Sequence, residues 1–169
     1  MASIPPPEHR AEARTGELPC QSFRFSTDTS SICVFDLGSL KHRVDDDADW
    51  WCWPPEEQVS EVNAGNVAII DLGNDGEFVV HLQFSRLPHP QIEVQLSCPT
   101  GRVFVGAAEE ITSEGQEPDC TRGGGFISIA TGAFSLQVDR GTTAGKLCLA
   151  LTAQGKTAGN NFMRPLRLA

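Results

Sequence analysis

Apolar and polar residues alternate along most of this chain, in short runs that are separated by turn-forming residues. In residues 92–96, 134–138 and 147–151 every second position is apolar, which is the period of a β-strand with one buried face. Residues 32–35 are apolar at every position, so we expect this strand at the centre of a sheet. The chain holds about eight or nine such runs at spacings near ten residues.

Turn residues join two pairs of these runs. The pairs are 67–72 with 77–84, and 126–129 with 134–138. The first connection contains Asn-Asp-Gly, whose residue types tolerate the positive φ of a tight turn, and the second contains a Thr-Gly turn. Each pair is therefore predicted to form a β-hairpin. Residues 162–168 are expected as a terminal edge strand, where Pro165 does least harm to a sheet.

Helical patterning is confined to one early region. Residues 36–44 carry apolar side chains at offsets of three and four, which predicts a short helix. Residues 54–62 begin with prolines and acids and are followed by Gly65, as is typical of a helix start and a glycine C-cap. With no alternation of strands and helices, the pattern predicts a mainly β fold: an antiparallel β-sandwich with a short helical insertion.

Composition bounds the domain organisation. Residues 1–19 combine a proline triplet with mixed charges and few apolar side chains, which predicts a flexible N-terminal arm. Residues 20–169 are then expected to form a single β-sandwich domain. There is no secretory signal and no apolar run long enough to cross a membrane, so we expect a soluble cytoplasmic protein without a membrane partner. The six cysteines form no CxxC pair and are expected as free thiols rather than zinc ligands.

The negative charge is concentrated in one segment. The net charge is −9, yet residues 28–77 hold twelve acidic residues against only Lys41 and Arg43. Nucleic-acid binding requires Lys and Arg to replace phosphate counterions, so this charge disfavours a nucleic-acid partner. It favours a basic protein surface or a cation. Solubility alone is the simpler alternative for such an excess.

Residues 44–53, Val-Asp-Asp-Asp-Ala-Asp-Trp-Trp-Cys-Trp, are called here the acidic segment. Carboxylates this close together repel one another unless water, cations or a basic partner surround them, and large aromatics offer wide contact area. We therefore expect a partner-binding surface in which the aspartates and the indoles face outward together. It would consist of Asp45, Asp46, Asp47, Asp49, Trp50, Trp51, Trp53 and Glu56. The alternative is that some of the tryptophans fill the gap between the helical insertion and the sheets.

A calcium loop is a second interpretation of the same residues. Asp45, Asp47 and Asp49 have the spacing of positions one, three and five, and Glu56 falls at position twelve. Position six, which requires glycine, is however occupied by Trp50. We therefore expect no metal and no cofactor. A divalent-cation or small-ligand module remains the alternative, with the 109–125 loop completing the mouth of its site.

Catalytic signatures are weak. The chain has no GxSxG motif, and His81 alternates with apolar residues in a strand, where an exposed or structural role is expected. His42 is predicted on a helix surface. The triplet 123–125 precedes a strand rather than a helix, which favours a flexible hinge over a phosphate-binding loop. The sequence therefore predicts a protein that is not an enzyme; a hydrolase with a triad assembled in space is the third possibility.

A family resemblance adds to this picture. The motifs that carry it are residues 25–29, 35–37, 42–51, 65–67 and 125–129. With them the chain resembles, over residues 21–168, a family of small bacterial proteins classed as a domain of unknown function. The resemblance implies a bacterial cytosolic protein of the type that acts as an immunity partner of toxins delivered between competing bacteria, as by type VI secretion. It assigns no catalytic residue.

Together these observations predict a non-enzymatic, acidic β-sandwich that binds and neutralises a basic cognate protein. The expected partner is a toxin with a nucleic-acid or nucleotide substrate. The sequence leaves the oligomeric state and the strand order open.

Overall fold

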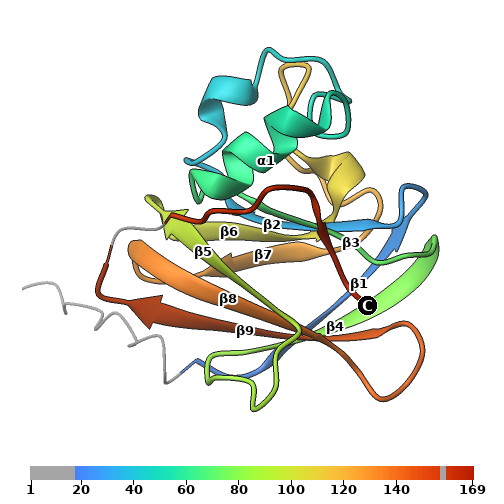
Figure 1. Ribbon diagram of the computed structural model, residues 1–169, viewed down its shortest axis with the longest axis vertical. Coiled ribbons are helices and arrows are strands. Elements are labelled where there is room, and N and C mark those ends of the chain that lie inside the picture. The colour runs from blue at the N-terminus through green and yellow to red at the C-terminus, as the bar shows by residue number, and fades with distance from the viewer. Residues whose placement is uncertain (1–17, 157–158) are drawn as a thin grey trace, which may run out of the picture.

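A computed structural model describes residues 18–156 and 159–169 of the chain. The predicted flexible arm, residues 1–19, lies outside the described residues except for its last two. The described residues form two five-stranded sheets and a short helical insertion (Figure 1).

Sheet A contains, in spatial order, β1 (Gln21–Thr27), β4 (Gly76–Gln83), β9 (Lys146–Gln154), β8 (Gly132–Arg140) and β5 (Ile92–Cys98). Sheet B contains β10 (Leu166–Arg167), β3 (Ala68–Asp71), β2 (Ser31–Asp36), β6 (Arg102–Ala107) and β7 (Gly125–Ser128). The helical elements are η2 (Lys41–Arg43), α1 (Pro55–Asn63) and η3 (Ala108–Glu110). The prediction of a mainly β fold with a short helical insertion is confirmed. Both sheets are mixed, because β4 pairs with β9 and β10 pairs with β3 in parallel.

Both predicted hairpins are wrong. β3 lies in sheet B and β4 in sheet A, and β7 and β8 are divided between the sheets in the same way. The turn residues do reverse the chain, but each strand then crosses to the other sheet, where it buries its apolar side chains against a different neighbour: β3 pairs with β2, and β4 with β1. A turn motif determines a change of direction, whereas the choice of pairing partner depends on the whole core.

The core lies between the sheets and extends to the outer side of sheet B. Phe35 on β2 and Phe104 on β6 are fully buried, with ring centroids 5.9 Å apart. Every residue of β2 is buried, as expected for a central strand that is apolar on both faces. Figure 1 shows why: the insertion that contains α1 covers the outer side of sheet B.

Only one of the two predicted helices forms. α1 begins with Pro55 at its first position and has Glu56 and Glu57 in the first turn, where they suit the helix dipole. Residues 36–44, in contrast, form turns and the single 3-10 turn η2. The buried carboxylate of Asp36 accepts hydrogen bonds from the backbone N–H groups of Gly38 and Gly101, at 2.7 Å each. These bonds hold the chain in a turn where the apolar spacing alone predicted a helix.

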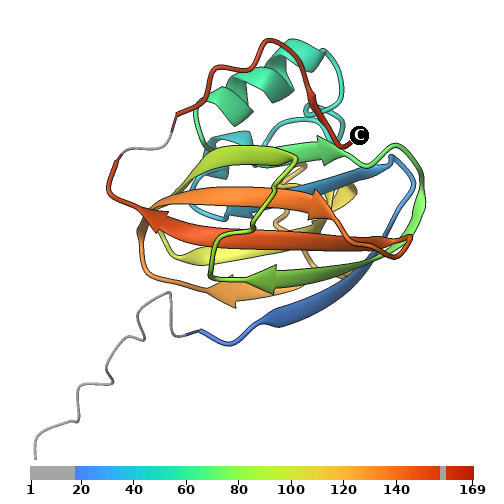
Figure 2. The ribbon, with the colours of Figure 1, turned by 60° about the horizontal axis from the view of Figure 1, so that its bottom comes forward.

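The C-terminal segment returns to sheet B beside α1 (Figure 2). Asn160 donates its backbone N–H to the carbonyl of Asn63 at 2.9 Å, and Leu166 and Leu168 are buried next to β3. The predicted terminal edge strand is confirmed in the two residues of β10, which begins directly after Pro165.

Candidate functional site

The acidic segment is a chain of tight turns between η2 and α1. Backbone bonds from Asp46 N–H to the Arg43 carbonyl, from Trp50 N–H to Asp47 and from Cys52 N–H to Asp49 close successive turns at 2.9–3.1 Å. Short turns of this kind turn neighbouring side chains in different directions. The segment therefore divides its residues between the protein interior and the solvent.

The expectation that all three indoles face outward is wrong for two of them. Trp50 and Trp51 are each only 5% exposed and belong to the hydrophobic core, whereas Trp53 is 75% exposed. The indole Nε1–H of Trp50 donates to the backbone carbonyl of Thr112 at 3.0 Å, which satisfies its polar group inside the protein. Two tryptophans thus anchor the segment to the fold, because large aromatic side chains gain most from burial.

Arg43 forms the second anchor. Its Nη1 donates to Asp46 at 2.8 Å and to Glu57 at 2.6 Å, its Nε donates to Glu61 at 2.8 Å, and its guanidinium lies 4.6 Å from the ring centre of Trp50. Partial burial by itself would lower the pKa of Arg43, but the hydrogen bonds to these carboxylates outweigh it and raise the pKa. Arg43 therefore stays charged and ties the acidic segment to α1.

Glu61 is the most buried carboxylate of this network, with a side chain 8% exposed. Burial alone would raise the pKa of Glu61, yet hydrogen bonds from Asn66, His42 and Arg43 lower it. His42 contacts Glu61 at 2.8 Å, so its ring is engaged with a carboxylate of α1. This network ties the acidic segment to α1.

The aspartates of the acidic segment, together with Glu57, surround a shallow depression of ≈ 520 Å³. It is lined by Arg43, Asp45, Asp46, Asp47, Asp49, Trp50, Trp53, Pro54 and Glu57. The structure thus brings together the four predicted aspartates and the exposed indole. Glu56 is exposed but does not line the depression, and Trp51 is buried away from it. Within residues 18–156 and 159–169, no ion pair involves Asp45, Asp47 or Asp49.

A second loop, residues 108–122, lies against the acidic segment. Glu114 donates its backbone N–H to the carbonyl of Asp46 at 2.9 Å, and Gly115 donates to that of Val44. The loop surrounds a smaller hollow of ≈ 200 Å³, which Ala48 also lines. Its exposed acids continue the surface of the acidic segment. We call the combined surface the acidic face; it consists of Asp45, Asp46, Asp47, Asp49, Trp53, Glu57, Glu114, Glu117 and Asp119.

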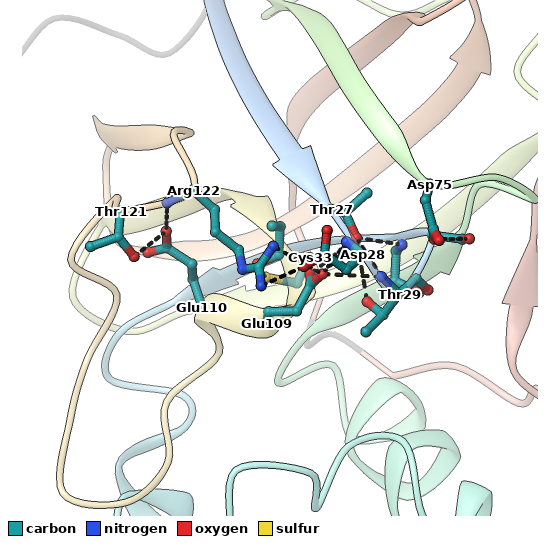
Figure 3. Close-up of polar contacts among 12 residues, drawn as sticks. Thr27, Asp28, Thr29, Cys33, Asp75, Glu109, Glu110, Thr121 and Arg122 are labelled. Carbon is teal, nitrogen blue, oxygen red and sulfur yellow. Dashed lines mark hydrogen bonds and ion pairs between the residues drawn. The ribbon is translucent and has the colours of Figure 1, made fainter.

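Two glutamates hold this loop in place (Figure 3). Glu109 accepts hydrogen bonds from the Thr27 hydroxyl at 3.0 Å and from the backbone N–H of Asp28 at 2.6 Å, at the turn after β1. Glu110, 8% exposed, accepts the backbone N–H groups of Cys120 at 2.7 Å and Arg122 at 2.5 Å. Sequence reasoning treated this loop as an exposed stretch and missed both anchors. The pattern offers no signal that separates them from its other glutamates.

The electrostatics of the loop follow from these contacts. Asp28 lies 2.8 Å from the guanidinium of Arg122, and their hydrogen bond raises the pKa of Arg122. Hydrogen bonds from Thr121 lower the pKa of Asp119, so this exposed acid stays ionised. Beneath the loop, burial raises the pKa of the Cys33 thiol, and the charge of Glu109 adds to the effect. Cys33 is therefore an unreactive, neutral thiol.

The glycine triplet is not a hinge. Gly123 and Gly124 have φ of 87° and 80°, and a Cβ on either would meet backbone atoms of β1 or β6. Gly124 donates its N–H to the Arg24 carbonyl at 2.7 Å, so the loop returns along the free edge of β1. Glycine is needed at both positions because the backbones approach closely. The two glycines therefore fix the end of the 108–122 loop in place.

Other sequence candidates lie elsewhere. His81 is exposed on sheet A and bonds the Ser22 hydroxyl through Nδ1 at 2.9 Å. All six cysteines are free, as predicted. Among the described residues, no group of three or more His, Cys, Asp or Glu side chains is arranged to hold a metal ion. In the same part of the chain, no helix has the length and apolar character needed to span a bilayer.

Fold and site define a mixed two-sheet β-sandwich with an acidic face beside its helical insertion. Residues 20–168 match the family of unknown function DUF6386, and the chain belongs to this family. A solved structure described as "Crocagin biosynthetic gene J" is similar at 12% identity and a TM-score of 0.52, over 81% of this chain and 99% of that chain. ComJ from Bacillus subtilis, described as an inhibitor of the DNA degrading activity of NucA, is similar at 9% identity and a TM-score of 0.48, over 81% and 96%. No curated protein matches significantly. At 12% identity the first similarity shows the shared fold alone.

Proposed function

We propose that this protein is a non-enzymatic inhibitor that binds a basic partner protein through its acidic face. The observation that supports this most strongly is the joining of two distant segments by backbone hydrogen bonds into one acidic surface, in which carboxylates of the acidic segment surround the exposed Trp53. Like charges at this density raise the free energy of the isolated protein, and a cationic surface would relieve the repulsion.

The two kinds of side chain have different roles in this proposal. Asp45, Asp47 and Asp49 steer the encounter and pair with Lys or Arg of the partner, which acts mainly on the association rate. Trp53 supplies a contact hot spot, because tryptophans at the centre of an interface contribute disproportionately to affinity. The Arg43 network and the buried tryptophans keep the acidic segment preorganised, which reduces the entropy lost on binding.

We further propose the class of partner. A protein that acts on nucleic acid or nucleotides has a basic substrate site, because phosphates require Lys and Arg, and such a site is complementary to the acidic face. Together with the family resemblance, this favours a toxin delivered between bacteria, which the protein neutralises in the cytoplasm as an immunity protein. The proposal does not depend on the similarity to ComJ.

The test uses the product of the neighbouring open reading frame as the candidate partner. The triple variant Asp45→Lys, Asp47→Lys, Asp49→Lys should associate roughly 10- to 100-fold more slowly at low salt, with a weaker dependence on salt. Stopped-flow fluorescence of Trp53 measures the rate. Co-expression should show that the wild type protects cells from the partner and the variant does not.

Asp47→Lys and Glu77→Lys form the matched comparison. Both acids are exposed and both changes are identical in charge, but Glu77 lies on β4 in sheet A. If the two variants slow association equally, the slower rate results from the change in net charge, and the acidic face is not the binding site.

Calorimetric titration with Ca²⁺ or Mg²⁺ tests the alternative of a cation-binding module. Heat of binding that disappears in Asp47→Ala would favour this alternative over the inhibitor, since Asp47 lines the depression.

A further inference from the structure

A groove of ≈ 660 Å³ lies along the C-terminal segment, which is hydrogen-bonded to the last residue of α1. Ile92, Phe162, Met163, Pro165 and Leu166 form most of its apolar lining. Met163 is 91% exposed, although thioether side chains usually fill gaps in a core. Arg164 and Arg167 line this groove and no acidic side chain does, in a protein of net charge −9.

The exposure of Met163 is imposed by the fold. The side chain of Asn63, the last residue of α1, accepts the Phe162 N–H at 2.7 Å and donates to the Phe162 carbonyl at 2.9 Å. On the other side of Met163, Leu166 is buried beside β3. The chain is fixed on both sides of Met163, and its side chain lies in the solvent between these two contacts.

Trp53 is the other exposed large hydrophobic residue of the described chain. It lies two residues before the start of α1, whereas Met163 follows the contact with the last residue of this helix. The two residues therefore lie at opposite ends of α1. Trp53 is surrounded by carboxylates, and Met163 is flanked by the guanidinium of Arg164. The two patches are complementary in charge and both offer apolar contact.

We propose that the groove binds the Trp53 patch of a second copy of this chain. In this contact Trp53 lies against Met163 and Phe162, since thioether sulfur packs favourably on aromatic rings. Arg164 faces the aspartates of the second copy. Arg167, 69% exposed and 3.4 Å from Asp71, contributes a weaker charge. Two different patches meet in this contact, so copies join either reciprocally across a twofold axis, with each Trp53 patch on the groove of the other copy, or head-to-tail from copy to copy.

Such a contact has a consequence for the acidic face. One copy covers the Trp53 patch of the next, so self-association competes with any basic partner. This consequence, unlike the contact itself, rests on the function proposed above. Because each patch is small, we expect weak association with a dissociation constant on the order of 10⁻⁴ M.

The experiment is sedimentation velocity on the full chain alone, from about 10 μM to about 1 mM, at about 20 mM and about 500 mM salt. At low salt the weighted sedimentation coefficient should rise with concentration, and at high salt the rise should shrink. Arg164→Glu and Met163→Gln should each remove most of the rise. Both side chains are exposed, so neither change threatens folding.

Lys156→Glu is the matched control, since it changes the charge equally at an exposed lysine outside the groove. Combining Arg164→Glu with the triple change Asp45→Lys, Asp47→Lys and Asp49→Lys should restore association, because the reversed charges attract again. A wild type that stays monomeric at the highest concentration and lowest salt overturns the proposal. The proposal is also overturned if Lys156→Glu reduces the rise of the sedimentation coefficient as much as Arg164→Glu does. Neither result affects the inhibitor proposal, which is tested with the basic partner.

Discussion

The acidic segment and the 108–122 loop carry similar charge but are attached to the fold in different ways. The segment is held by two buried indoles and by Arg43, whereas the loop is held by Glu109 and Glu110, which accept backbone N–H groups. In both regions, residues of the same type are buried at one position and exposed at another. Trp50 is an anchor and Trp53 is exposed; Glu110 is an anchor and Glu117 is exposed. Residue type alone therefore does not identify the members of a binding surface.

The tryptophans should show the largest difference. Trp50→Ala removes a buried aromatic and its hydrogen bond to Thr112, so the free energy of unfolding should fall by about 3–5 kcal/mol. Trp53→Ala should change it by no more than about 0.5 kcal/mol, because its side chain is 75% exposed. Urea denaturation of both variants measures this. If both variants lost similar unfolding free energy, Trp50 would not be a structural anchor distinct from the exposed Trp53.

Arg43 should come next. Arg43→Met leaves Glu61 buried without its guanidinium partner, which should cost roughly 2 kcal/mol of unfolding free energy. Lys41→Met, which removes an exposed charge from the same 3-10 turn, is the control and should be nearly neutral. The measurement is again urea denaturation. An Arg43→Met protein as stable as Lys41→Met would mean that the network does not hold the segment.

In the loop, Glu110→Gln should destabilise the fold by about 1–2 kcal/mol, because one amide oxygen cannot replace both carboxylate oxygens that accept Cys120 and Arg122. Glu117→Gln should be neutral in thermal unfolding. Hydrogen exchange should show faster opening of residues 119–123 in the first variant alone. If residues 119–123 were equally protected from hydrogen exchange in both variants, Glu110 would not be the anchor of the loop.

The smallest effect concerns pH. The folded-state pKa of Glu61 is lowered, so its contribution is fully present above the ordinary value of about 4.3 and is lost as pH falls through the lower folded value. The difference in stability between the wild type and Glu61→Gln should therefore be constant near neutrality and should shrink in acid. Glu56→Gln, at an exposed position of the same helix, should show no such change. A difference that stays constant into acid contradicts the prediction.

Sequence reasoning succeeded where local pattern is sufficient. It located the strands through their period and α1 through its proline and acids. It failed at the two hairpins because a turn motif does not specify a pairing partner. It failed at residues 36–44 because the Asp36 carboxylate, bonded to Gly101 far along the chain, overrides the helical spacing.

Alternation, turn residues and charge distribution by themselves determined a mainly β, acidic protein with its charge in one early segment, because these properties depend on nearest neighbours and on composition. Only the tertiary structure decided which strands share a sheet, that Trp50 and Trp51 are buried and Trp53 is not, and that a loop more than fifty residues away extends the acidic face. The physical reason is that burial and partner choice are set by competition among all apolar surfaces and hydrogen-bonding groups of the chain at once.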